Sequence, residues 1–390
     1  MDLAEFKSPL GTLVPIQGVD SRLREYDHFA FVPRPLPDSI SLGSRTWTAV
    51  VRAAEALGRL NQACSSLPNP RLLVVPALYR EAQTTSELEG THATTEEILR
   101  ASAPFDSSGT PETAEVLAYV RVAEHAFEWV RDRPVTEGLL CSSQDTLARA
   151  AVKTPLDPGR VREHRVVIGP DDCRVEDARF VPPPPGDQLR SDFTRWVEWT
   201  EMAPTDIHPI VAAGIAHYQF ETLHPFGDGN GRLGRLSIIL QLLRMRTLDE
   251  PSFSISSWLV SRRLEYQDHM LRVSQTGDWD PWVTFFANAI EAQARAAADV
   301  AGGLSEWKAG LLAELNSHNY SGTIVTLAND LIDWPYVSAR GVSERYEVTI
   351  PAAQGAIDRL AGLGYLTERT GRSYNRRWGA TYVMQAVESL

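Results

Sequence analysis

The sequence predicts a mainly α protein with a small β-hairpin and a C-terminal domain of winged-helix type. Apolar residues recur at helical spacing along most of the chain, and two short β-prone runs flank a polar turn between residues 161 and 185. Near the C-terminus, three helical segments precede two further β-prone segments. Because 390 residues with 43% apolar content can bury more than one core, we expect three parts, at residues 1–93, 94–300 and 304–390.

Composition excludes several classes of protein. The 50 acidic and 38 basic residues give a net charge of −12, which disfavours coating of nucleic acid. The three cysteines, Cys64, Cys141 and Cys173, form no CxxC pair, which argues against a disulfide framework or a thiolate zinc site. There is neither a signal-peptide pattern nor a run of 18 apolar residues. We therefore expect a cytoplasmic protein with no membrane contact.

The N-terminal third is predicted to be an extended arm followed by helices. Residues 1–45 are rich in proline and lack clear periodicity, which indicates an extended arm. Helical spacing then covers residues 46–60, and a second helix could begin at Pro76 and end at Gly90. Further helices are predicted at about residues 94–102, 113–131 and 136–153.

The middle of the chain combines the predicted hairpin with more helices. Residues 166–168 and 178–181 are the two β-prone runs, and four prolines at 182–185 keep the next segment extended. A long helix through Trp196 and Trp199 follows. Helical runs at 210–221 and 236–243 come next, and others continue to about residue 298.

The C-terminal part begins, in this prediction, at Gly302 and Gly303. Helices are expected near residues 307–316, 326–331 and 351–363, with strands at 364–367 and 381–384 around an arginine-rich turn. That order is typical of a winged helix, which could contact DNA, contact protein or act as a structural cap. The third helix carries one basic residue, Arg359, whereas the turn holds Arg369, Arg372, Arg376 and Arg377.

Residues 224–235 carry the strongest chemical signal. Three glycines and an asparagine allow tight turns whose N–H groups converge on an anion, and the next helix presents its positive N-terminus there. Arg232 and Arg235 are three residues apart and add guanidinium groups for more phosphate oxygens. His224 can act as a base and Asp228 as a ligand for Mg²⁺ bound to phosphates.

Other interpretations of this segment fit less well. A calcium loop would place Arg232 and Ile239 at ligand positions, and a P-loop would need a Gly-Lys-Ser/Thr sequence that does not follow. A plain turn between helices explains the glycines but gives no reason for the histidine, aspartate and two arginines.

The segment resembles the signature of the Fic-domain (Fic/DOC) family, HPFx(D/E)GNGRxxR, at every fixed position. The resemblance implies the Fic helical core and a protein adenylyltransferase, which transfers AMP from ATP to a Ser, Thr or Tyr hydroxyl of a protein target. It further implies that His224 is the general base and that Asp228 holds Mg²⁺. The residues implied to bind ATP are Gly229, Asn230, Gly231, Arg232 and Arg235.

The predicted hairpin resembles the family's flap, which docks the target as an added strand. Arg162, Ile168 and Gly169 agree with the family pattern, and Val166, Val167 and Ile168 are the residues implied to dock the target. Pro170 and a missing aromatic residue depart from that pattern, so target preference stays open. An ordinary surface hairpin is the alternative.

Residues 85–90 match a second family pattern, (S/T)xxxE(G/N), which is inhibitory in relatives. Thr85 and Glu89 lie one helical turn apart, and the resemblance implies that Glu89 pairs with Arg235 and restrains the enzyme. Three functions remain open: an autoinhibited adenylyltransferase, an enzyme that also or instead removes AMP, and a DNA-binding regulator that senses nucleotide. A homodimer is also considered.

Overall fold

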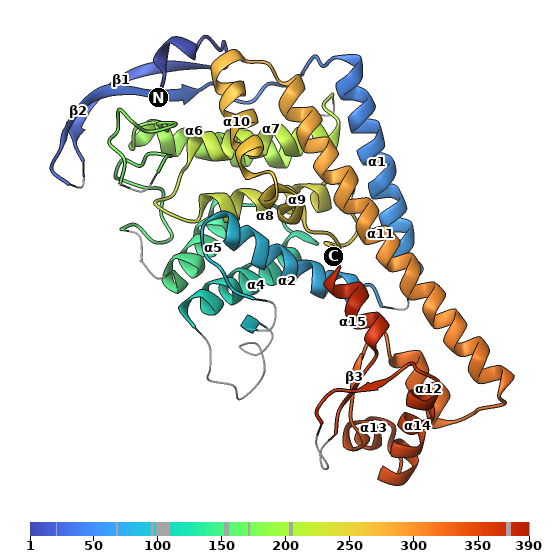
Figure 1. The fold of residues 1–390 in the computed structure, drawn as a ribbon. Coiled ribbons are helices and arrows are strands. Elements are labelled where there is room, and N and C mark those ends of the chain that lie inside the picture. The colour runs from blue at the N-terminus through green and yellow to red at the C-terminus, as the bar shows by residue number, and fades with distance from the viewer. Residues whose placement is uncertain are drawn as a thin grey trace. The chain divides into compact units, whose positions relative to one another are not determined.

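The structure is a computed structural model that confirms a mainly helical fold (Figure 1). It describes residues 1–389 apart from 21, 68, 95–96, 99–109, 152–155, 171, 203–205 and 372–375. Two compact units are present, one formed by Met1–Gly58 and Leu78–Gln293 and the other by Arg59–Ala77 and Ala294–Leu390. The three-part division stays a prediction. Among the described helices, none has the length and apolar character needed to span a membrane.

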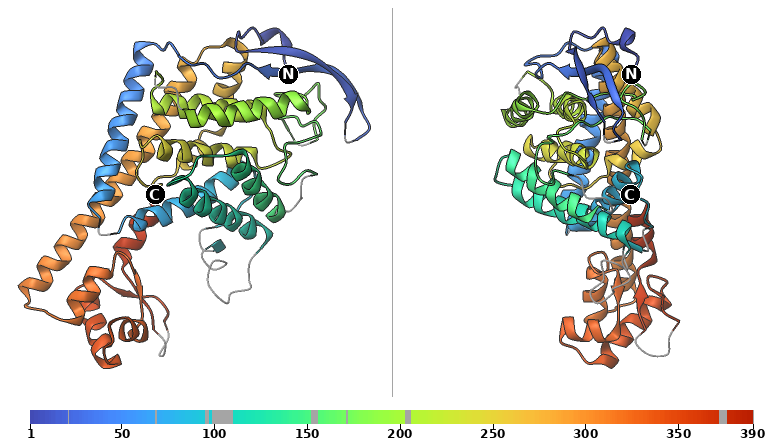
Figure 2. Two further views of the ribbon diagram at one scale, coloured as in Figure 1. Left: turned by 180° about the vertical axis from the view of Figure 1, so that it is seen from behind. Right: turned by 90° about the vertical axis from the view of Figure 1, so that its left-hand side faces the viewer.

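The N-terminal arm is a β-hairpin, which corrects the expectation of an irregular extended segment. Strands β1 (Gly11–Val19) and β2 (Glu25–Pro33) pair antiparallel, with Gly11 opposite Pro33, and project as a long ribbon (Figure 2). Proline is tolerated because a two-stranded sheet consists of edge strands only. Ile16 and Ala30 pack against Val175, Ala178 and Val181, so the hairpin supports the segment predicted to be the flap.

Helix α1 (Ser44–Ser65) forms as predicted, but α2 (Arg71–Leu88) begins earlier than expected. Pro76 lies inside α2, because the helix begins upstream at Arg71. At that start, the Asn69 side chain accepts a hydrogen bond from the Arg71 N–H at 3.0 Å. The downstream end agrees with the prediction, since Gly90 has a φ of +95°.

The other predicted helices up to residue 298 are present where the structure describes the chain. The helix expected at 94–102 and the end of the one expected at 136–153 fall largely outside the described residues. Thr110 and Thr136 cap the next two helices, each accepting from a backbone N–H three residues ahead. The helices are α4 (Pro111–Val130), α5 (Glu137–Ala150), α6 (Asp187–Met202), α7 (Pro209–Leu223), α8 (Asn230–Arg244), α9 (Ile255–Val260), α10 (Arg263–Thr276) and α11 (Asp280–Ser317).

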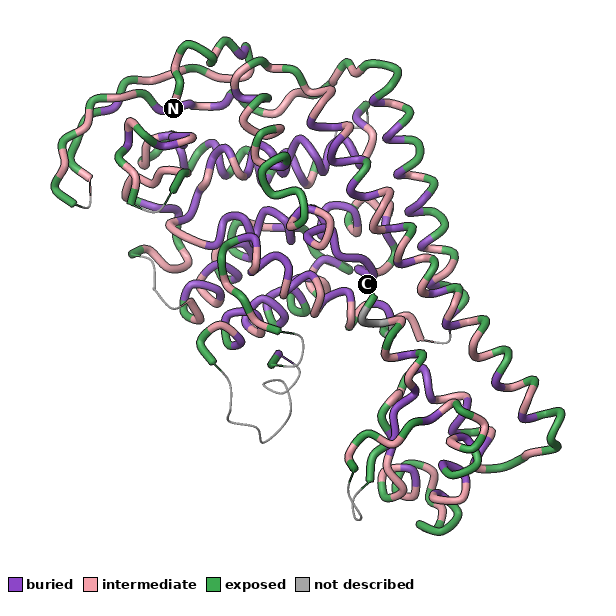
Figure 3. The backbone as a smooth tube through the Cα atoms, viewed as in Figure 1, coloured by how far each residue is buried: buried purple, intermediate pink, exposed green. Residues whose placement is uncertain are grey.

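Helices α7 and α8 form the centre of the first unit and are buried along almost their whole length (Figure 3). Backbone carbonyls in the middle of α7 also accept hydrogen bonds from its neighbours. Trp196 of α6 donates its indole N–H to the Ala216 carbonyl at 2.8 Å, and Trp282 of α11 donates to the Gly214 carbonyl at 2.9 Å. Because both faces of α7 are occupied, the loop that follows it starts from a fixed position.

The predicted hairpin at 161–185 is reduced to a single antiparallel bridge. Ile168 and Phe180 exchange two backbone hydrogen bonds, of 2.9 and 3.0 Å. The β-prone runs therefore meet where predicted, but the described residues beside the bridge form no continuing ladder.

The second unit corrects two expectations about its elements. Gly302 and Gly303 lie inside α11. A Cβ on Gly303 would lie 2.6 Å from the Tyr382 hydroxyl oxygen, so the glycine leaves space in the helix surface for that side chain. Residues 381–384 belong to a helix and not to a strand. That helix stacks Tyr382 on Trp307 with ring centroids 6.0 Å apart. The elements are α12 (Thr323–Asp330), β3 (Tyr336–Val337), α13 (Ala339–Tyr346), α14 (Ile350–Gly362), β4 (Thr367–Glu368), β5 (Trp378–Gly379) and α15 (Thr381–Glu388).

The three short strands form an antiparallel sheet in the order β3-β5-β4. The sequence missed α13 and β3, and of the strand predicted at 364–367 only Thr367 lies in a strand, β4. Arg372 of the predicted arginine-rich turn lies outside the described residues. The winged-helix assignment and its DNA or protein contact stay predictions.

We expect Gly214→Val to lower the free energy of unfolding by about 1 to 3 kcal/mol, because a Cβ at Gly214 would lie 2.9 Å from the ring of Phe286. Gly58→Ala in α1 is the matched control. No described atom lies within 4 Å of its added methyl group, and it should stabilise the protein by roughly 0.5 to 1 kcal/mol. Urea denaturation measures both. Equal midpoints for the two variants would contradict the packing described for α7.

Candidate active site

The loop between α7 and α8 is held by its own side chains. His224 has a left-handed backbone with a φ of +48°, and Gly229 has a φ of +77° immediately before α8. The Asn230 amide accepts from the Phe226 N–H at 2.9 Å and donates to the Phe226 carbonyl at 2.8 Å. The Phe226 ring is buried against Phe193, with centroids 5.5 Å apart. The loop is therefore rigid before any ligand arrives.

Arg162 fastens this loop to the segment that precedes the bridge. Its guanidinium donates to four backbone carbonyls, and 1% of the residue is exposed. Burial, with a contribution from the charge of Arg165, lowers the pKa of Arg162 to about 10, so it remains charged at neutral pH. The acceptors are the carbonyls of His224 at 2.8 Å, His164 at 3.1 Å, Pro183 at 2.7 Å and Leu223 at 3.4 Å.

The His224 imidazole is oriented as a base. Its Nδ1 lies 3.3 Å from the Glu221 carbonyl oxygen. Because a carbonyl only accepts, this contact assigns the proton to Nδ1 and leaves the lone pair on Nε2. Burial, together with the charge of Arg162, lowers the pKa of His224 to about 4. The imidazole is therefore neutral at pH 7 and able to accept a proton.

The N-terminus of α8 is suited to bind an anion. Gly229 provides no side-chain cap, so the first N–H groups of the helix remain for an outside acceptor. The Glu89 carboxylate occupies part of this position. A Cβ added to Gly231 would lie 2.0 Å from Glu89 Oε1, which places the carboxylate directly against the backbone of Gly231.

Arg235 joins α8 to the end of α2. Its Nη2 lies 2.6 Å from Glu89 Oε1 and 3.0 Å from the Thr85 carbonyl, and its Nε donates to Thr85 Oγ1 at 2.7 Å. Burial acts to raise the pKa of Glu89, but the Arg235 guanidinium outweighs it and holds that pKa below its usual value. Thr85 on the last turn of α2 and Glu89 directly after that helix therefore lie on one side, as predicted, and both contact a charged Arg235.

Arg232 has different partners from Arg235, although the sequence suggested a shared direction. Its Nη1 pairs with Glu115 of α4 at 2.6 Å in a buried contact, and its Nη2 lies 3.3 Å from Asp228 Oδ2. No partner is present for its buried Nε among the described residues. Glu115 could not be predicted from the sequence, since a partner 117 residues away leaves no local pattern.

Asp228 can serve as a single metal ligand. Its side chain is 45% exposed, and one oxygen accepts from the Gly229 N–H at 2.7 Å. No cluster of three or more His, Cys, Asp or Glu suited to a metal is present within the described part of the chain. One accessible carboxylate fits Mg²⁺, which commonly takes its other oxygens from phosphates and water.

These groups open onto a cavity of about 450 Å³. Among the described residues, its lining includes His224, Asp228, Gly231, Arg235 and Glu89, but not Gly229, Asn230 or Arg232. Val167 and Ile168 of the predicted flap line it, whereas Val166 does not. Sequence reasoning missed Glu221 and six residues of α10 that also line it, namely Arg263, Tyr266, Gln267, Met270, Leu271 and Ser274.

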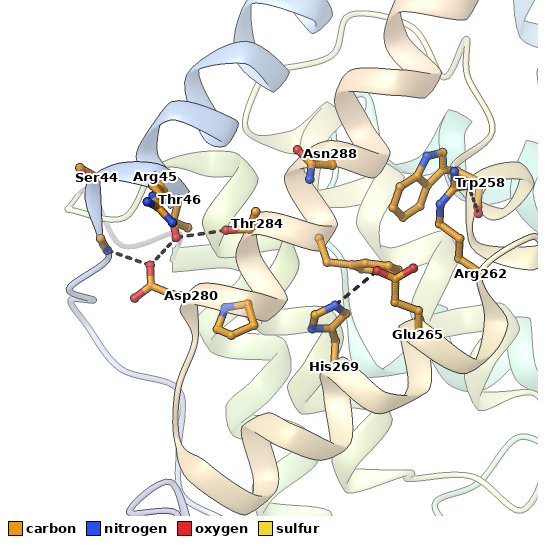
Figure 4. Close-up of a pocket in the computed structure, with 13 residues that line it drawn as sticks. Ser44, Arg45, Thr46, Trp258, Arg262, Glu265, His269, Asp280, Thr284 and Asn288 are labelled. Atoms are coloured by element: carbon orange, nitrogen blue, oxygen red, sulfur yellow. Dashed lines mark hydrogen bonds and ion pairs between the residues drawn. The ribbon is translucent and has the colours of Figure 1, made fainter.

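A second cavity, of about 690 Å³, lies on the other face of α10 (Figure 4). Glu265 and His269 of α10 line it together with Trp258, Asp280 and Thr284. Its described lining contains no residue of the 224–235 segment. Cavity size alone would therefore select a place without the phosphate-binding loop, and the chemistry of the side chains locates the site.

We expect Arg162→Ala to lower the free energy of unfolding by about 2 to 4 kcal/mol, because four carbonyls lose a charged donor. Arg162→Lys is the control, since it retains the charge without the planar fork. It should recover a minor part of the loss. Urea denaturation followed by tryptophan fluorescence measures both. A lysine variant as stable as the parent would show that charge alone, and not the geometry of the fork, holds His224.

Two family models match the chain, one described as "Fic/DOC family N-terminal" at residues 47–128 and one as "Fic/DOC family" at residues 134–242. A protein adenylyltransferase Fic of Drosophila sechellia is 34% identical over 139 residues, covering 35% of this chain and 25% of the relative. Its counterpart in Drosophila mojavensis is 26% identical over 259 residues, covering 64% of this chain and 46% of that protein. The chain thus spans about a quarter to a half of the length of these relatives.

Solved structures show the same fold. A Fic family protein from Desulfovibrio desulfuricans superposes with a TM-score of 0.59 and 21% identity, covering 88% of this chain and 98% of that chain. A Fic-domain-containing signaling protein from Bacteroides thetaiotaomicron gives a TM-score of 0.50 with 20% identity, covering 64% of this chain and 98% of that chain. These likenesses show the fold, and it is the two family matches, at residues 47–128 and 134–242, that identify the chain as a member of the Fic/DOC family.

Proposed function

We propose that this protein is an adenylyltransferase that moves AMP from ATP to a hydroxyl side chain of a protein, and that Glu89 restrains it. The contact that carries the proposal is the one of 2.6 Å between Glu89 Oε1 and Arg235 Nη2. It lies in the same cavity as His224 and the uncapped start of α8. The cavity therefore combines a base, an anion site and an internal anion that competes for that site.

The side chains suit nucleotidyl transfer. ATP phosphates would bind at the N-terminus of α8 and on Arg235, while the Arg232–Glu115 pair would hold the start of that helix. His224 Nε2 would take the proton from the target hydroxyl as its oxygen bonds to the α-phosphorus. The bond from that phosphorus to the bridging oxygen breaks, and pyrophosphate leaves. Mg²⁺ held by Asp228 would offset charge on the phosphates.

Target docking is assigned to the segment around the bridge. Ile168 is fixed by its two hydrogen bonds to Phe180, and Val167 beside it lines the cavity. An extended target segment could pair with the backbone of residues 166–168 and so carry its hydroxyl toward His224. Packing of Val167 against the core shared with β1 and β2 supports this position.

Restraint follows from the place that Glu89 occupies. Its carboxylate lies against Gly231 and on Arg235, so a phosphate cannot use either group until the carboxylate moves. Glu89 is ionised, which favours the pair. The same ionised group, 38% exposed in its side chain, could instead orient a water for AMP removal, and this is the second candidate function.

We expect Glu89→Gly to raise self-labelling or target labelling with ATP and Mg²⁺. If the blocked arrangement is favoured by about 2 to 3 kcal/mol, roughly 0.6 to 3% of molecules are competent, and the gain is about 30- to 150-fold. Mass spectrometry of the AMP adduct measures the rate. Glu89→Gln should activate less, because its amide can still contact Arg235. Arg235→Ala should not activate, because it also removes a phosphate contact. Equal or lower labelling by Glu89→Gly would favour AMP removal.

We expect His224→Ala in the Glu89→Gly background to reduce labelling by about 10² to 10⁴-fold. Affinity for ATP should change little, because amides, Arg235 and the metal hold the phosphates. Calorimetry measures the affinity and radiolabelled ATP measures the transfer. Labelling by the alanine variant at the parent rate would show that His224 is not the base.

A further inference from the structure

Glu221 is a buried carboxyl group in the active-site cavity to which the proposed mechanism gives no role. It lies on the last turn of α7 and lines the cavity with Glu89 and Arg235. Its Oε1 is buried, and no hydrogen-bond partner for it is present among the described residues. An unpaired buried carboxylate is costly, so a group in this position requires a reason.

Two glycines of α8 place both carboxyl groups on one helix face. A Cβ at Gly231 would lie 2.0 Å from Glu89 Oε1, and a Cβ at Gly234 would lie 2.3 Å from Glu221 Oε1. Residues three apart are neighbours on a helix, so the two carboxyl groups lie about one turn apart beside Arg235. We call the backbone at Gly231 and Gly234 the lower and upper step. Glu89 occupies the lower step and Glu221 the upper one.

The groups that face Glu221 explain how two carboxyls can share one guanidinium. Burial raises the pKa of Glu221, the charge of Arg235 of α8 opposes this, and Glu89, which follows α2, adds to it, so that the pKa is about 8. Tyr266 and Arg263 of α10, His217 of α7 and His224 directly after α7 complete the surroundings. Burial lowers the pKa of His217 to about 3 and that of His224 to about 4, and it raises the pKa of Tyr266. Between pH 6 and 9, Glu221 alone of these shifted groups titrates.

We infer that Glu221 is a positioning residue for Arg235 that holds a proton while an anion occupies the lower step and releases it when that step is empty. This inference rests on the proposed function for the identity of the second anion, a nucleotide phosphate. With Glu89 in place, a second negative charge on the upper step would be repelled. With Glu89 gone and no ligand, an ionised Glu221 is the remaining carboxylate for Arg235.

Proton linkage gives this exchange a direction. Removing Glu89 removes a charge that raises the pKa of Glu221, so the carboxyl group ionises at a lower pH. A phosphate on the lower step restores the negative charge and raises that pKa again. In Glu89→Gly, nucleotide binding must therefore take up a proton, and affinity must fall as pH rises between the two pKa values. In the parent protein a phosphate replaces the Glu89 carboxylate, so the negative charge near Glu221 changes less. The number of protons taken up on nucleotide binding is therefore smaller.

The first experiment needs no nucleotide. Carboxyl ¹³C NMR of the full-length protein with labelled glutamate, assigned by Glu221→Gln, follows the titration of Glu221 in the parent and in Glu89→Gly. We expect a midpoint near pH 8 in the parent and one lower by about one unit or more in Glu89→Gly. An ordinary midpoint in the parent, or the same midpoint in both proteins, would overturn the inference.

The second experiment measures protons directly. A non-hydrolysable ATP analogue with Mg²⁺ is titrated into Glu89→Gly at pH 7 to 9 in two buffers of different ionisation enthalpy. We expect uptake approaching one proton per nucleotide and affinity that falls up to tenfold per pH unit. Glu89→Gly with Glu221→Gln should take up no such proton and bind with little pH dependence. Thermal melts check that both variants fold.

The outcomes separate the two proposals. A shifted titration of Glu221 with no nucleotide binding at any pH would remove the proposed function and leave the coupling of the two carboxyl groups standing. Nucleotide binding with equal proton uptake in the single and double variants would retain the function and remove Glu221 from it.

Discussion

The positive charge of the buried Arg235 guanidinium must be balanced by nearby acceptors, and the site depends on which groups provide them. The residue is 2% exposed, and its charge is met by the Glu89 carboxylate and by two oxygen atoms of Thr85. Removing the compensating charge from a buried ion leaves a cost of several kcal/mol, so any anion that displaces Glu89 must itself bind Arg235. If the proposed function holds, the end of α2 and a nucleotide phosphate would compete for the same atoms. A second set of contacts fixes α2 one turn upstream of Thr85. There, buried Glu81 accepts hydrogen bonds from Ser254 Oγ at 2.8 Å and from the Ser256 N–H at 3.0 Å.

The loop between α7 and α8 is rich in glycine, yet side-chain contacts hold its backbone in one conformation. Its glycines permit the backbone, but side chains decide it: the Asn230 amide binds both backbone atoms of Phe226, and Arg162 binds the carbonyl of His224. These contacts place the His224 lone pair and the free N–H groups of α8 before substrate binds. Preorganised dipoles of this kind need no reorganisation at the moment of reaction, which is the main electrostatic contribution that an enzyme makes.

Glycine has three different physical roles in this chain. Gly229 provides a left-handed backbone at the start of α8. Gly231 and Gly234 provide space, since each seats a carboxyl group where a Cβ would stand. Gly303 provides space inside a continuous helix for Tyr382, although glycine pairs commonly mark a boundary. The identity of the residue is the same in each case, and the neighbour that approaches it determines the role.

The sequence by itself determined the mainly helical fold, most of the helices up to residue 298 and the loop of residues 224–235, because helical periodicity and a long signature are local properties. It also placed Thr85 and Glu89 on one helical face. Only the tertiary structure decided that Pro76 lies inside α2, that residues 11–33 form a hairpin and that residues 381–388 form a helix, since packing overrides local preference there. Only the tertiary structure brings Arg232 into contact with Glu115, Arg162 into contact with four carbonyls, and Glu221 against the backbone at Gly234. Most of those partners are distant in the chain, and burial, which strengthens the interactions of their charges, exists only once the helices have packed.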